Sequence, residues 1–112
     1  MEILEQSQVT YTILTVQGDF ICEDEKPTLR DTILRALSAG KKFIIIDLRN
    51  VHHMNSCGLG SLVCCMTTLR KSGGDLVLLS PTENVKFLLA VTKLDHIFRI
   101  YPTLEEAVAD FR

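Results

Sequence analysis

Apolar and polar side chains alternate near the start of the chain. Val9, Tyr11 and Ile13 are separated by polar threonines, which is the period of a strand with one buried face. A weaker strand is expected over residues 2–6, followed by a short turn at residues 7–8. The two segments are therefore predicted to pair as an antiparallel hairpin.

Two later segments are apolar without interruption, at residues 43–46 and 76–79. Runs of this kind are typical of strands in a sheet that helices cover on both faces. We accordingly expect Ile45, in the middle of the first run, to be a core residue without a direct functional role. A short final strand is predicted over residues 97–101.

Four further segments repeat their apolar residues every three to four positions, which predicts helices. The first is expected to begin at Pro27, a favourable residue in a first helical turn, and to end at Gly40. The second is expected to begin near Ser56, with Leu62 on its buried face. The apolar faces of the two helices are Leu29, Ile33 and Leu37, and Leu59, Leu62, Val63 and Met66.

Two capping boxes predict where the remaining helices begin. The first is predicted at Ser80, with Pro81 in the first turn and Glu83 as its acidic member. The second runs from Thr103 to Glu106. The expected buried faces are Val85, Leu88 and Leu89, and Leu104, Ala107, Val108 and Phe111.

The elements follow one another in the order β-β-α-β-α-β-α-β-α. Strands that alternate with helices favour right-handed crossovers and a mainly parallel sheet. We therefore predict one α/β domain over residues 1–112, with a mixed sheet of four to five strands and about four helices.

Composition and charge narrow the possible functions. The chain has 112 residues, of which 46% are hydrophobic and 23% charged, and its net charge is −2. It has no cluster of lysines and arginines of the kind that neutralises phosphates, so we expect no nucleic-acid binding. The apolar runs are far shorter than the ~20 residues that span a bilayer. The N-terminus has no signal-peptide pattern, so we expect a cytoplasmic protein without membrane insertion.

The cysteines and histidines do not have the spacing of metal ligands. Cys64 and Cys65 are adjacent, as are His52 and His53, and the chain has no C-x-x-C. We therefore expect no metal, no cofactor and no disulfide framework. The adjacent pair Cys64 and Cys65 is expected to be at or near the core, and the histidines are expected in a loop. Cys57 is predicted to lie in the first turn of a helix, either as a reactive thiol or as a stand-in for a small residue.

One segment carries the functional prediction: Met54-Asn55-Ser56-Cys57-Gly58-Leu59-Gly60. It resembles the Met-Asp-Ser-Ser/Thr-Gly-Leu-Gly segment of STAS anti-sigma factor antagonists, whose serine after the Asp is phosphorylated. The resemblance continues through residues 43–48, through Gly73-Gly74 and the strand behind it, and through residues 103–107. It covers nearly the whole chain, in the same order.

This resemblance implies a STAS fold and a regulatory protein that is not itself an enzyme. Its partner would be an anti-sigma factor with serine kinase activity, and phosphorylation would switch it off, with a possible phosphatase reversing the change. Sigma-factor-dependent transcription would be the process regulated. Ser56 is then the phosphorylation site. The expected partner-binding residues are Asn55, Ser56, Cys57, Gly58, Leu59 and Gly60.

Two positions depart from the family pattern. Asn55 stands where the family usually has Asp. Ile21 ends the sequence Gly18-Asp19-Phe20-Ile21 where the family tends to have Gly-Glu-Leu-Asp. Each change removes a carboxylate near the serine. A STAS module of another signalling or transport-associated complex, without phosphorylation, is therefore the alternative, and a small enzyme built at the same helix start is a third.

The chemistry of Ser56 allows two interpretations from the residues alone. A serine at a helix N-cap accepts a hydrogen bond from a free backbone N–H, which is a purely structural role. A phosphate at the same place would be accommodated by the positive end of the helix dipole. Asp19 and the acidic residues at 23–25 are expected at the same sheet edge, either as solvated surface or facing a basic partner.

Overall fold

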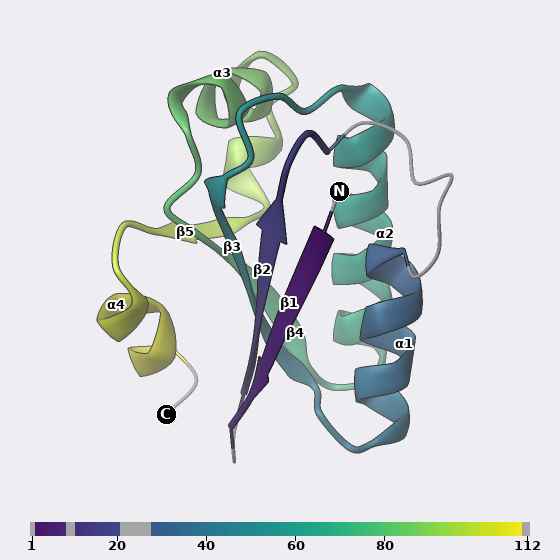
Figure 1. Ribbon diagram of the computed structural model, residues 1–112. Helices are drawn as coiled ribbons and strands as arrows, with labels where there is room; N and C mark the ends of the chain where they lie inside the picture. Colours follow the sequence, from purple (N-terminus) through teal and green to yellow (C-terminus); the bar gives the residue numbers. More distant parts are fainter. Residues whose placement is uncertain (1, 9–10, 21–27, 111–112) are drawn as a thin grey trace.

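The computed structural model describes residues 2–8, 11–20 and 28–110, and five strands form one sheet (Figure 1). The strands lie in chain order as β1 (Glu2–Ser7), β2 (Thr12–Gln17), β3 (Phe43–Asn50), β4 (Asp75–Leu79) and β5 (Arg99–Tyr101). β1 is antiparallel to β2, and each later pair of neighbours is parallel. The predicted hairpin and mainly parallel sheet are confirmed, although β2 begins only after Tyr11, and Val9 is outside the described residues.

Helices alternate with the strands as predicted. They are α1 (Leu29–Ser38), α2 (Ser56–Lys71), α3 (Glu83–Val91) and α4 (Leu104–Ala109), with a 3₁₀ turn, η1 (Leu94–His96), before β5. The α/β fold and the order β-β-α-β-α-β-α-β-α are confirmed. The last strand is shorter than predicted because Ile97 and Phe98 continue the turn of η1, with both of their N–H groups donating to the Leu94 carbonyl.

The larger core lies between the sheet and the helices α1 and α2, which cover the same face (Figure 1). Right-handed crossovers between consecutive neighbouring strands place both helices on that face. Leu62 of α2 is fully buried there, which confirms it as a core residue. The sheet contributes Leu14, Val16, Ile44, Ile46, Leu48, Leu76 and Leu78 to this core.

A smaller core lies on the opposite face of the sheet, under α4 (Figure 1). Successive side chains of a strand point to opposite faces, so the apolar run of β3 supplies both layers. Ile45 is fully buried in this second layer, as expected for a core residue. Its buried neighbours are Ile13, Val77, Leu79 and Ala107.

The helix starts differ from their predictions. Thr28 caps α1 in a capping box with Asp31, and Pro27 is outside the described residues. The predicted capping box at Ser80 is wrong, because α3 begins at Glu83 after an N-cap at Thr82. The Ser80 hydroxyl donates to the Pro102 carbonyl at 2.7 Å instead, and the Thr82 hydroxyl donates to Val51. Both side chains bind neighbouring loops rather than the helix.

At α4 the predicted cap is confirmed only in part. Thr103 is the N-cap and accepts a hydrogen bond from the Glu106 N–H at 3.3 Å. The Glu106 carboxylate accepts from the Thr103 hydroxyl rather than completing the box at the backbone. Leu104 is exposed, so α4 is anchored mainly by Ala107, and Phe111 is outside the described residues.

Candidate functional site

Residues 54–60 lie at the end of the sheet to which the parallel strands β2 to β5 point. Phe20, just after β2, forms a parallel bridge with Met54, and its N–H donates to the His53 carbonyl at 2.9 Å. The expectation that the chain after β2 runs beside the Ser56 loop is therefore confirmed at Phe20. Asp19 beside it is exposed, whereas Ile21 and the acidic residues at 23–25 are outside the described residues.

Asn55, not Ser56, is the N-cap of α2. Its backbone is extended, with φ −108° and ψ −176°, and its Oδ1 accepts a hydrogen bond from the Gly58 N–H at 3.0 Å. The sequence-based placement of Ser56 at the cap is wrong by one residue, because the amide of Asn55 already satisfies that N–H. Asn55 thus retains the capping geometry that an Asp would provide and lacks only its charge.

Ser56 is the first residue of α2 and its side chain is exposed. In the described part of the chain its hydroxyl makes no hydrogen bond. The first turn of α2 contains no acidic residue, so no carboxylate there opposes a negative charge. The helix start carries free N–H groups and a positive partial charge. An anion on the Ser56 oxygen is therefore compatible with this helix end.

The segment is divided into buried and exposed residues. A Cβ on Gly58 would lie 2.2 Å from the Phe20 carbonyl oxygen, so this position requires glycine for close packing. Leu59 is 3% exposed and belongs to the larger core. Gly60 faces open space. The surface that a partner can reach is therefore formed by Asn55, Ser56, Cys57 and Gly60.

The cysteines and histidines around this segment differ in exposure. Cys57 and Cys64 are exposed on α2, while Cys65 is buried. The prediction that Cys64 is at or near the core is therefore wrong, because it lies on the outer side of the helix. His52 and His53 are exposed loop residues, as expected. The described residues include no group of three acidic, histidine or cysteine side chains that could hold a metal.

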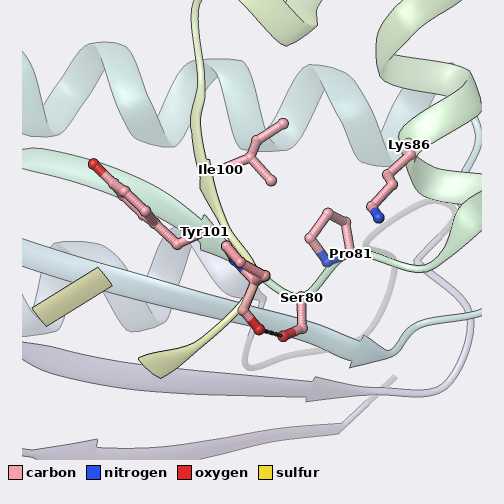
Figure 2. A pocket seen from close by; sticks show the side chains of 6 residues that line it. Ser80, Pro81, Lys86, Ile100 and Tyr101 are labelled. Carbon is pink, nitrogen blue, oxygen red and sulfur yellow. Dashed lines mark hydrogen bonds between the residues drawn. The ribbon is translucent and has the colours of Figure 1, made fainter. Parts of the chain in front are cut away.

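A shallow cavity of about 320 Å³ lies at the same end of the sheet, at a place where no site was predicted (Figure 2). It is lined by Ser80, Pro81, Lys86, Ile100, Tyr101 and Pro102. The chain beside it is joined to the loop before Asn55, since the Asn84 amide donates to the His52 carbonyl at 2.9 Å. Ser80, at the edge of this cavity, has a positive φ of 49°. In the sequence, the Ser80–Pro81 pair is the pattern that marks this place.

No helix in the described ranges is both long and apolar enough to cross a membrane.

Comparisons with known proteins agree with this geometry. A model of the STAS domain matches residues 1–107. A Thermotoga maritima protein named as a candidate anti-sigma factor antagonist is 37% identical over 76 residues, covering 68% of this chain and 67% of its own. A crystal structure so named, from the same organism, matches with a TM-score of 0.83 and 26% identity, over 98% of this chain and 94% of its own.

The anti-sigma factor antagonist SpoIIAA has a similar fold in two forms. The unphosphorylated form matches with a TM-score of 0.73 and 19% identity, over 97% of this chain and 96% of its own. The phosphorylated form, from Bacillus, matches with a TM-score of 0.75 and 20% identity, over 99% and 100%. At these identities the likeness concerns the fold alone.

Proposed function

Because this chain belongs to the STAS domain family, we propose that it is an anti-sigma factor antagonist controlled at Ser56. In this role it binds an anti-sigma factor that has serine kinase activity and thereby releases a sigma factor for transcription. Phosphorylation of Ser56 ends the binding, and a phosphatase restores it. The protein acts in the cytoplasm. It is both the ligand and the substrate of the kinase, which binds the ATP and catalyses the transfer.

One observation carries the proposal: Ser56 is the first residue of a helix that Asn55 caps, and its exposed hydroxyl has no hydrogen-bond partner among the described residues. The kinase would transfer the γ-phosphoryl group of ATP to the Ser56 oxygen, which gives up its proton, and ADP would leave with the oxygen that bridged the β- and γ-phosphates. The product carries about −1.5 to −2 charge, and the helix dipole stabilises it. Because Asn55 holds the cap, the phosphate need not break any hydrogen bond of α2. The change then alters the surface and leaves the fold intact.

The partner would lie against Asn55, Ser56, Cys57 and Gly60. These side chains are small and uncharged, so a partner backbone can approach closely. A phosphate adds bulk and charge at the centre of that contact, and it must be desolvated for the partner to stay bound. Binding is therefore expected to be strong without the phosphate and weak with it. Buried Gly58 and Leu59 act indirectly, by holding the loop against Phe20 and the core.

The test is phosphorylation by an anti-sigma kinase of the same cell with ATP, followed by mass spectrometry. The wild type should gain one phosphoryl group on Ser56. Ser56→Ala should gain none, and Ser61→Ala, a matched change five residues further along α2, should behave as wild type. Ser56→Asp should bind the kinase more weakly than wild type, while Ser56→Ala should still bind.

Asn55 tests whether the missing carboxylate matters to the kinase. Asn55→Asp keeps a capping oxygen and restores the family's charge, so we expect faster phosphorylation of Ser56. If phosphoserine never forms at Ser56 and Ser56→Asp binds every partner as tightly as wild type, the switch is refuted. The alternative, a STAS binding module of another signalling or transport-associated complex, would then stand.

A further inference from the structure

Two exposed side chains on α3 form an apolar pair. Phe87 is 70% exposed and Val91 is 58% exposed. They are four residues apart, so they are neighbours on one side of the helix. The core takes Val85 and Leu89 from a different side of α3 and leaves this pair in solvent. Single exposed apolar residues are ordinary, whereas a group of them marks a candidate interaction surface.

The pair lies on the side of α3 that faces the loop leading into α2. Asn84 is three residues before Phe87 and seven before Val91, so the three side chains follow one stripe of the helix. The Asn84 amide donates to the His52 carbonyl at 2.9 Å, so this stripe borders that loop. Lys86, on the other flank of α3, lines the cavity beside β5 (Figure 2). The apolar pair therefore belongs to the α2 side of α3 and not to the cavity.

The side of α2 that carries Ser56 faces the same region. Ser56, Val63 and Arg70 are spaced by seven residues, about two helical turns, and so share one side of α2. Arg70 donates to the Ile97 carbonyl at 3.0 Å, which places this side next to the end of η1. Gly58 is on the opposite side and packs against the chain after β2. Because α3 packs against η1 and lies at the same end of the sheet as the start of α2 (Figure 1), Ser56 and the apolar pair border one surface.

The residues around Ser56 are too small to hold a partner on their own. Asn55, Ser56, Cys57 and Gly60 offer little apolar area. A stable protein–protein interface buries about 800 Å² on each partner, and aromatic residues are enriched in its core. A single phenylalanine buries about 150–250 Å². A protein large enough to contact Ser56 stably must therefore cover neighbouring surface as well, and Phe87 is the exposed aromatic residue on that surface.

We propose that Phe87 and Val91 form an apolar anchor for the same anti-sigma factor that contacts Ser56. The inference rests on the proposed function, since it assigns a second part of the contact to that one partner, which must present an apolar patch beside the site that receives Ser56. The anchor supplies affinity that does not depend on phosphorylation, whereas Ser56 supplies the switch. A second copy of this chain on the same surface would instead compete with the kinase for the Ser56 side of α2.

The first test is calorimetric titration of the purified anti-sigma kinase with the unphosphorylated chain. Phe87→Ala should raise the dissociation constant about tenfold or more, as for an aromatic residue at the centre of an interface. Phe87→Leu keeps an apolar side chain and should raise it less. Leu104→Ala is the matched control, because it removes an exposed leucine from α4 on the opposite face of the sheet (Figure 1), and it should bind as wild type does. A circular dichroism spectrum checks that each variant is folded.

The second test is the steady-state rate of Ser56 phosphorylation at varied concentrations of the chain. Phe87→Ala should raise KM and leave kcat unchanged, because the anchor binds equally well before and during phosphoryl transfer. Val91→Ala should raise KM by a smaller factor, since its side chain is smaller. A lower kcat with an unchanged KM would overturn the anchor, because α3 would then act on the Ser56 loop and not on binding.

The outcomes separate this inference from the proposed function. If wild type binds the kinase and is phosphorylated, and Phe87→Ala does both with the same constants, the anchor is refuted and the Ser56 switch stands. If wild type neither binds the kinase nor is phosphorylated, both are refuted. Sedimentation of the chain alone adds a further outcome: a dimer that Phe87→Ala dissociates would assign this surface to a second copy and overturn the anchor.

Discussion

The two ends of α2 are held by different kinds of interaction. At the N-terminal end a neutral amide caps the helix, Gly58 packs against Phe20, and residues 54–60 make no ion pair within the described part of the chain. At the C-terminal end Arg70 contacts the Asp75 carboxylate at 3.0 Å. Asp75 also binds Arg99, which in turn holds Asp110 at 2.6 Å.

This charged network joins four elements of the fold. Arg70 belongs to α2, Asp75 begins β4, Arg99 begins β5, and Asp110 follows α4. Arg70 also donates to the Ile97 carbonyl at 3.0 Å. Burial lowers the pKa of Arg99, but attraction to Asp75 and the hydrogen bond to Asp110 outweigh this and raise it. One end of α2 is thus fixed by charge, and the other is neutral, with no acidic residue in its first turn.

The largest effect should come from the middle of α2, which supports both ends. Leu62→Ala removes a fully buried side chain and leaves a cavity. We expect a loss of about 2–5 kcal/mol in the free energy of unfolding, measured by denaturant titration. Ile45→Ala, on the other face of the sheet, should lose a similar amount. An unchanged stability in both variants would show that the two cores are misplaced.

The charged end should respond next most strongly. Asp75→Asn removes the carboxylate that Arg70 and Arg99 share, and both guanidinium groups are then left without their main partner. Because the arginines are about half exposed, we expect a loss of about 1–3 kcal/mol, less than for a fully buried pair. The matched control is Glu83→Gln, which breaks the exposed pair with Lys86 and should cost at most about 0.5 kcal/mol. Equal losses in the two variants would contradict the special role of the network.

At the neutral end the effect should be smaller and confined to the cap. Asn55→Ala removes the oxygen that binds the Gly58 N–H and should cost about 0.5–2 kcal/mol. Ser56→Ala should stay within about 0.5 kcal/mol of wild type, because its hydroxyl is exposed and holds no helix N–H. Denaturant titration of the two variants measures both losses in the free energy of unfolding. A larger loss in the free energy of unfolding for Ser56→Ala than for Asn55→Ala would show that Ser56, not Asn55, caps the helix.

The smallest effect concerns Tyr101, next to the charged network. Burial, reinforced by the nearby Asp110 carboxylate, raises the pKa of its phenol. The unfolded chain releases this proton near pH 10, while the folded protein still holds it, so stability falls as pH rises above that point. Tyr101→Phe should lessen this alkaline loss and leave the pH dependence below it unchanged. Identical alkaline profiles for the two proteins would rule out this contribution.

Much of the fold could be predicted because it depends on local patterns. The unbroken run in β3 and the three-to-four spacing in α2 each report burial of one element, whatever its neighbours are. The family-like segment likewise drew attention to Ser56. The predicted helix cap was wrong where two adjacent residues could both fill the same role. Asn55 and Ser56 are both good caps, and only the backbone geometry shows which one holds the Gly58 N–H.

The sequence by itself therefore determined the order of the elements, the two apolar layers of β3 and the position of the candidate switch. The tertiary structure alone decided that Phe20 lies against Gly58, that Ser80 binds the loop after β5, and that Asp75 meets two arginines. The physical reason is distance along the chain. Periodicity records which side of an element is buried, but contacts between residues 20 and 58, or 75 and 99, exist only after the strands have taken their places in the sheet.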